Sequence, residues 1–121
     1  MGAASSVLVG VVAALHVYFL VLEMFLWTTP FGQKTFAKSA EEMQQTKVLA
    51  GNQGLYNGFL AAGLVWSLTA AEPTAYALKL FFLGCVVIAG LYGAATASKK
   101  ILFVQTVPAL AAMLVTLLAH R

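Results

Sequence analysis

Hydrophobic residues form four long runs along the chain, at about 5–27, 48–69, 74–97 and 100–119. Each run is close to the roughly 20 residues that a helix needs to cross the hydrocarbon core of a bilayer. Pro30 follows the first run and Pro73 follows the second, as expected where helices end. The pattern predicts an all-α protein, organised over residues 1–121 as a single integral membrane domain with a transmembrane four-helix bundle.

The connection after the first run is long, and its second half has helical features. Ser39 and Glu42 have the spacing of a capping box, and Phe36, Ala40 and Met43 recur at helical intervals. We therefore expect a helix that begins near Ala40 and continues unbroken into the second span. This second helix would extend roughly 15 Å into the cytoplasm. The alternative is a mobile loop.

The composition supports a place in the membrane. Hydrophobic residues make up 61% of the chain and charged residues 9%, against about 25% charged in soluble domains. This composition excludes two classes of protein: a disordered tail, and a cytosolic enzyme with a polar exterior. The basic residues are dispersed without interleaved aromatic residues, which argues against nucleic-acid binding. Cys85 is the single cysteine, and no metal-ligand spacing is present, so we predict neither a disulfide, nor a metal, nor a cofactor.

The lysines predict the orientation in the cell (inner) membrane. The connections after the first and third runs hold five of them: Lys34, Lys38, Lys47, Lys99 and Lys100. The opposite side holds Lys79, near the start of the third run, and Arg121. Because lysine-rich loops remain in the cytoplasm, we expect both termini outside.

Polar residues inside the runs are the candidates for function. Glu23 is the acidic residue well inside a run, where a charge costs a few kcal/mol and usually has a role. His16 lies seven positions earlier on the same helical stripe. Most polar residues of the four runs lie at a similar distance from the cytoplasmic end of their predicted helix. This similar depth in the membrane predicts one polar layer across the bundle. The predicted ligand- or proton-binding residues are Glu23, His16, Asn52, Gln53, Asn57, Tyr92 and Gln105. The alternative for each amide is structural, as a hydrogen bond between helices.

Small residues predict close helix contacts. Gly54 and Gly58 form a GxxxG motif, and Gly90 and Ala94 form a similar pair. These faces could pack within the chain or form a homo-oligomer.

Three segments carry a family resemblance: LHVYFLVLEMFLWTTPFGQKTF, NQGLYNGFLAAGLVW and FFLGCVVIAGLYGAAT. Together they resemble the bacterial and fungal membrane family called domain of unknown function 1304. The resemblance covers nearly the whole chain and implies a short four-span integral membrane protein. It implies no activity.

Three classes of function fit these features. One membrane-embedded glutamate in the first of four spans is similar in plan to small multidrug transporters, which suggests proton-linked transport of a lipophilic or cationic small molecule by an oligomer. That family's glycine-rich, tryptophan-bearing third helix is absent here. The second class is an intramembrane isomerase, epimerase or transferase acting on a lipophilic substrate, with Glu23 as base and Tyr92 or His16 as acid. The third is a structural or accessory subunit. Transport is slightly preferred.

Overall fold

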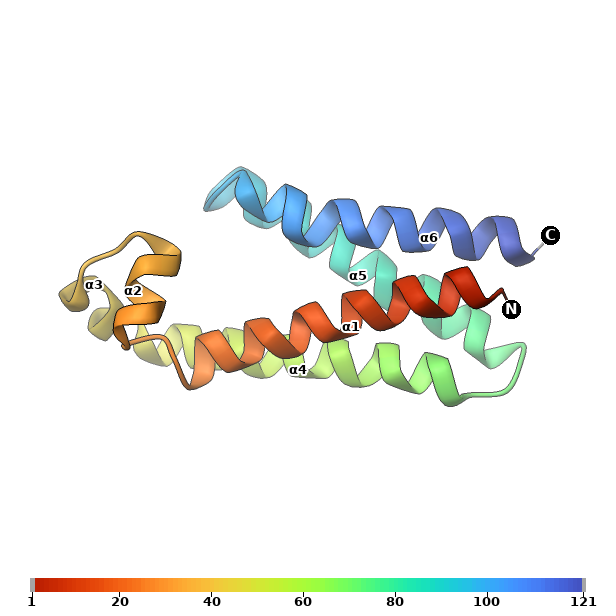
Figure 1. Ribbon diagram of the computed structural model, residues 1–121, viewed down its shortest axis with the longest axis horizontal. Helices are drawn as coiled ribbons and strands as arrows, with labels where there is room; N and C mark the ends of the chain where they lie inside the picture. Colours follow the sequence, from red (N-terminus) through yellow and green to blue (C-terminus); the bar gives the residue numbers. More distant parts are fainter. Residues whose placement is uncertain (1, 121) are drawn as a thin grey trace. The chain divides into compact units, whose positions relative to one another are not determined.

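The computed structural model describes residues 2–120 and is all-α, as predicted (Figure 1). The long helices are α1 (Ala3–Met24), α4 (Lys47–Thr69), α5 (Thr74–Thr96) and α6 (Val107–His120). Two short helices, α2 (Pro30–Phe36) and α3 (Ala40–Gln45), lie between α1 and α4 in the sequence. A π-helical segment, η1 (Leu102–Thr106), precedes α6.

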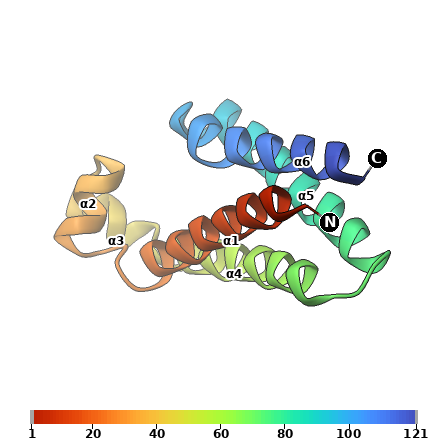
Figure 2. The same ribbon diagram turned by 45° about the vertical axis from the view of Figure 1, so that its right-hand side comes forward.

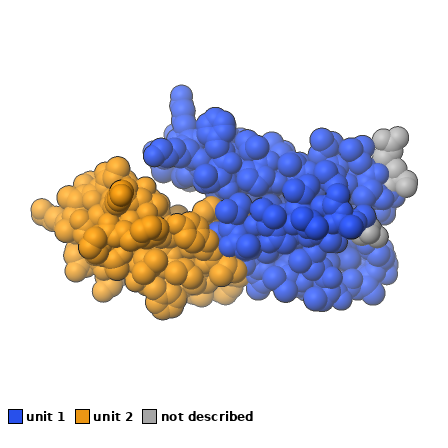
Figure 3. Space-filling view, viewed as in Figure 1, with its two compact units in different colours: residues 1–15, 60–121 blue, residues 16–59 orange. Residues whose placement is uncertain are grey.

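The chain divides into two compact units (Figure 3). Unit 1 consists of residues 1–15 and 60–121, and unit 2 of residues 16–59. The boundary falls inside α1 and inside α4, so each of these helices contributes one part to each unit.

Three helices of the described chain are long and apolar enough to cross a membrane: Ala3–Met24, Thr74–Thr96 and Leu102–His120. They correspond to the first, third and fourth predicted spans. Helix α4 has the necessary length, with 23 residues, but is not among these three. Its first half carries Asn52, Gln53 and Asn57, which lower its apolar character. Membrane crossing by α4 therefore stays a prediction.

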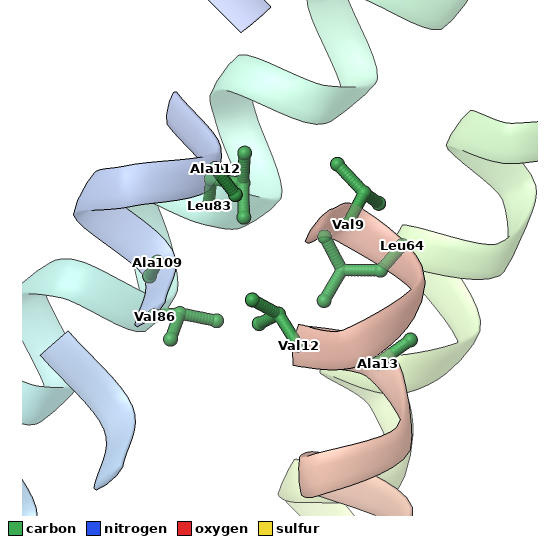
Figure 4. Close-up of a cluster of buried hydrophobic side chains, with 8 residues drawn as sticks. All are labelled: Val9, Val12, Ala13, Leu64, Leu83, Val86, Ala109 and Ala112. Carbon is green, nitrogen blue, oxygen red and sulfur yellow. The ribbon is translucent and has the colours of Figure 1, made fainter. Parts of the chain in front are cut away.

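Unit 1 has a tightly packed apolar core (Figure 4). Figures 1 and 2 show α5 and α6 side by side within this unit. Small residues also permit α4 and α5 to approach closely: a Cβ atom at Gly63 of α4 would collide with the ring of Phe82 of α5. This is the packing expected of helices in lipid, where close contact replaces the hydrophobic driving force. The core comprises Val9, Val12, Ala13, Leu64, Leu83, Val86, Ala109 and Ala112.

The π-helical turn η1 is explained by the proline that follows it. Pro108 has no N–H, and its ring would crowd the carbonyl group four residues earlier in a regular α-helix. The chain widens just before this proline, where the Val107 N–H donates to the carbonyl oxygen of Leu102, five residues back. The predicted fourth span thus begins as a π-helix and continues as α6.

Unit 2 contains a helix that the sequence pattern did not predict. Pro30 follows the end of the first run, and it is also the first residue of α2. Thr29 caps this helix by accepting a hydrogen bond from the Gly32 N–H (3.2 Å). Proline is favoured at the first helical position because its missing N–H would have no partner there. The helix ends at Ala37, which has a left-handed backbone conformation (φ 53°).

Helix α3 begins at Ala40, as predicted, and the capping box is present. The Ser39 hydroxyl accepts from the Glu42 N–H (3.2 Å), and Glu42 Oε1 accepts from the Ser39 N–H (3.1 Å). The expected unbroken continuation into the second span is wrong, because the helix is interrupted at Thr46. The Thr46 hydroxyl donates back to the Glu42 carbonyl oxygen (2.8 Å), a contact that often bends helices.

The interruption at Thr46 also provides a contact for the end of α1. Trp27 Nε1 donates to Thr46 Oγ1 (3.0 Å), and the Trp27 ring packs on Phe36 with ring centroids 4.7 Å apart. This arrangement joins the end of α1 to α2 and to the junction of α3 with α4, all within unit 2.

Candidate functional site

Glu23 lies in the last turn of α1 and is 6% exposed. Two amides of α4 hold its carboxylate. Gln53 Nε2 donates to Glu23 Oε2 (2.6 Å), and Asn57 Nδ2 donates to Glu23 Oε1 (2.5 Å). Gln53 and Asn57 are four residues apart, so they lie on one face of α4, one turn above the other. We call these three residues the carboxylate–amide cluster.

Two glycines allow α1 to approach this face. A Cβ atom at Gly54 would lie 2.7 Å from Met24 Cγ and 3.1 Å from Glu23 Cβ. A Cβ atom at Gly58 would lie 2.7 Å from Leu20 Cδ1. The predicted GxxxG contact is therefore present and lies within the chain. It brings the two backbones close enough for the short amide side chains to reach the carboxylate.

The hydrogen bonds compensate the cost of burying the acid. A carboxylate at the centre of a membrane helix costs about 2.5–3.5 kcal/mol on insertion scales, which is an upper limit for Glu23 in the last turn of α1. Hydrogen bonds to charged groups contribute about 1.5–3 kcal/mol each. The free energy contributed by two such bonds, to Oε1 and Oε2, is therefore comparable with the free-energy cost of burying the carboxylate.

The partners are neutral, which distinguishes this cluster from a buried ion pair. Each amide can donate through its NH₂ group or, after rotation about its last bond, accept through its carbonyl oxygen. Gln53 and Asn57 can thus donate to an ionised carboxylate, and the carbonyl oxygen of either one can accept a hydrogen bond from the O–H of the neutral acid. A lysine or arginine in their place would favour only the ionised form.

His16 belongs to the same unit. Its side chain is fully buried, and its ring meets the edge of Phe19 at a centroid distance of 5.1 Å. It lies seven residues before Glu23 on α1. Its predicted role in proton or ligand binding stays a prediction.

Asn52 is oriented differently from its neighbours. Its side chain is exposed, and Asn52 Nδ2 donates to the carbonyl oxygen of Val48 on the same helix (3.0 Å). Each residue of an α-helix turns by about 100°, so Asn52 and Asn57, five residues apart, face directions about 140° apart. Asn52 therefore lies outside the carboxylate–amide cluster.

Tyr92 and Gln105 belong to unit 1. Tyr92 has 72% of its surface exposed, and Gln105 is half-buried in the π-helical turn. The polar layer expected from all four long helices stays a prediction.

Comparisons with known proteins identify relatives without a known activity. The profile of the family described as "Protein of unknown function (DUF1304)" matches residues 10–117. The chain is 30% identical over 90 residues to "Uncharacterized protein YpaA" of Lactococcus lactis subsp. lactis (strain IL1403). That alignment covers 73% of this chain and 75% of the relative. No solved structure matches the chain significantly. Because the profile spans nearly the whole sequence, the chain belongs to the DUF1304 family.

Proposed function

We propose that this protein binds a cationic or lipophilic small molecule at Glu23 and exchanges it for a proton, acting as a small proton-linked membrane transporter. The observation that supports the proposal is the carboxylate–amide cluster, in which a buried carboxylate is held by two neutral amides. A buried acid without a basic hydrogen-bonding partner can neutralise a positively charged ligand. The same acid can take up a proton when the ligand leaves.

The amides support exchange because they suit both states of the acid. In the ligand-bound state Gln53 and Asn57 donate to the carboxylate, as they do here. In the protonated state one of them rotates and accepts the Glu23 O–H. This change requires rotation about one side-chain bond and no shift of a helix.

Transport also requires that α4 cross the membrane. Its amides lower its apolar character, but Gln53 and Asn57 are already hydrogen-bonded to Glu23, which reduces the cost of placing these amides in the membrane. With α4 as the second span, the lysine-rich connections lie in the cytoplasm and both termini lie outside.

The proposed transporter is an oligomer, since four short helices enclose little space. Gly54 and Gly58 pack against α1 of the same chain, and a Cβ atom at Gly90 would collide with Thr106 of the same chain. The predicted oligomer faces at Gly54/Gly58 and Gly90/Ala94 are thus largely used internally. An oligomer would form through other exposed apolar side chains.

The proposal is tested by thermal unfolding of the purified full chain with a ligand panel at acidic and alkaline pH. The panel contains tetraphenylphosphonium as a lipophilic cation, glutathione as a thiol, and decanoate and cholesterol as an acid and a neutral lipid. A ligand that binds the native state raises the unfolding temperature. We expect tetraphenylphosphonium to raise the unfolding temperature at alkaline pH. Glu23→Gln should abolish this rise. Glu41→Gln is the matched control, because Glu41 is an exposed acid of α3.

Other outcomes would favour the other two functions. Protection by a neutral or anionic lipophile that Glu23→Gln retains, with turnover lost, would indicate an intramembrane enzyme. If no ligand protects and Glu23→Gln changes only stability or assembly, the protein is an accessory subunit. Either result would contradict transport.

A further inference from the structure

Unit 1 contains a second buried charge, on a residue that the proposed function does not use. Lys79 of α5 is 1% exposed. The sequence pattern places it near the outer end of a span, where lysines usually extend towards water. Here the side chain turns inward, so a role other than orientation needs to be considered.

The ammonium group of Lys79 contacts hydroxyl groups of α1. Lys79 Nζ donates to Ser5 Oγ (3.1 Å) and to Ser6 Oγ (3.4 Å). Ser5 Oγ lies 2.7 Å from Thr116 Oγ1 of α6. We call Ser5, Ser6, Lys79 and Thr116 the lysine–hydroxyl cluster. It joins three helices of unit 1, and Ser5 and Thr116 are fully buried.

The hydrogen-bonding partners of Lys79 carry no charge to balance it. An ammonium has three N–H donors, and the two hydrogen bonds recorded within the described chain use two of them. Glu72 is an acid near Lys79. Its carboxylate, however, accepts a hydrogen bond from the Tyr76 N–H (2.9 Å) at the start of α5. The cluster is therefore a buried cation surrounded by neutral hydroxyls.

We propose that the lysine–hydroxyl cluster binds the oxyanion of a membrane amphiphile, a carboxylate or a phosphate ester. Lys79 supplies the charge, and the hydroxyls of Ser5, Ser6 and Thr116 can rotate to donate towards an anion. Ser5 and Ser6 lie in the first turn of α1, where the helix dipole favours negative charge.

The helices that form the cluster also carry exposed apolar side chains, which favours a ligand with an alkyl chain. Val7, next to Ser6, is 64% exposed, and Leu114 of α6 is 58% exposed. These apolar side chains would lie in lipid if α1 and α6 cross the membrane. An anion that reaches the cluster from the bilayer therefore carries an apolar tail, whereas a free ion would arrive from water.

The test uses the full chain in phosphatidylcholine nanodiscs and four probes: dodecanoate, dodecyl phosphate, dodecanol and inorganic phosphate. The first three share one chain length, so they differ only in the head group. The apparent affinity is obtained from the rise in unfolding temperature with probe concentration. We expect dodecanoate and dodecyl phosphate to raise the unfolding temperature and dodecanol to leave it unchanged. Protection by inorganic phosphate as well would support the same oxyanion site with a water-soluble source.

Substitutions connect the binding to Lys79. Lys79→Met is expected to weaken dodecyl phosphate binding by roughly 10- to 100-fold, the range for one charge-assisted hydrogen bond. Lys79→Arg, which keeps the charge, should retain most of the affinity. Lys100→Met is the matched control, because Lys100 is exposed, and it should change nothing.

Two results would overturn the proposal. One is equal protection by dodecanol, which would mean that only the alkyl chain is bound. The other is unchanged binding by Lys79→Met. If Lys79→Met does not fold, Glu72→Gln tests the proposal instead. Removing the negative charge of Glu72 should strengthen dodecyl phosphate binding several-fold. Unchanged or weaker binding by this variant would refute an oxyanion site at Lys79.

Discussion

The substitution Asn57→Leu tests how strongly the carboxylate–amide cluster stabilises the protein. Asn57 is 9% exposed and donates to Glu23 Oε1 at 2.5 Å. Leucine has a similar volume, so the main loss is the hydrogen bond to a buried carboxylate. Such a bond contributes about 1.5–3 kcal/mol in proteins generally, whereas hydrogen bonds between membrane helices average about 0.6 kcal/mol. Because this acceptor is a buried carboxylate, we expect a loss of about 1–3 kcal/mol.

The matched control is Asn52→Leu. Asn52 is on the same helix, but its side chain is exposed and donates only to the backbone of Val48. We expect its effect to stay within about 0.5 kcal/mol, as for other surface substitutions. The two variants therefore separate the loss of the Glu23 contact from the general effect of replacing an asparagine on α4.

The assay is reversible unfolding in mixed micelles, followed by tryptophan fluorescence as the fraction of sodium dodecyl sulfate increases. A double-mutant cycle with Glu23→Leu isolates the pairwise contribution, which we expect to account for most of the Asn57→Leu effect. If Asn57→Leu is no more destabilising than Asn52→Leu, or if the two substitutions of the cycle are additive, then the hydrogen bond from Asn57 to Glu23 does not stabilise the protein.

Three further predictions concern packing, pH and topology. Gly54→Leu should destabilise the protein by about 1–3 kcal/mol, because the added side chain collides with Met24 and Glu23. Gly51→Leu is the control and should not destabilise the protein, because a Cβ atom at Gly51 has open space. Unfolding in mixed micelles measures the stability of both variants. Hydrogen bonds from the Ser39 backbone and hydroxyl lower the pKa of Glu42. Ionised Glu42 should therefore stabilise α3 fully at pH values above the unfolded-state pKa of this acid. The stabilisation should be lost as pH falls through the lowered folded-state pKa, and the NMR shifts of the α3 backbone amides would report this loss. A cysteine replacing Lys47, in a background without the native cysteine, should react with impermeant thiol reagents only from the cytoplasmic side; labelling from outside would reverse the proposed orientation.

The long helices were predictable because hydrophobic runs of sufficient length leave few alternatives. Helix α5 spans Thr74–Thr96 against the predicted 74–97, since Pro73 marks its start clearly. The short elements were harder to predict because they depend on one or two side chains. Pro30 ends one run and begins α2, and a helix is interrupted at Thr46, whose hydroxyl donates back to the Glu42 carbonyl oxygen. The π-helical turn before Pro108 likewise depends on local packing that periodicity does not report.

The candidate site was predictable in part. The sequence places a buried acid and several amides at similar depth, and the four-residue interval of Gln53 and Asn57 puts them on one face. Asn52 was grouped with them by depth alone, but its helical phase directs it elsewhere. The inward turn of Lys79 could not be predicted, because it depends on hydroxyls of α1 that are distant in the sequence.

Exchange of a cation for a proton at Glu23 predicts that the binding of tetraphenylphosphonium depends on pH, which equilibrium binding measurements over a pH series would detect. If ligand and proton compete for one carboxylate, affinity should rise by about tenfold per pH unit until the acid is ionised, and then level off. Glu23→Gln should abolish this dependence together with the binding, and Glu41→Gln should preserve both. Binding that is independent of pH, or that Glu23→Gln retains, would contradict the account.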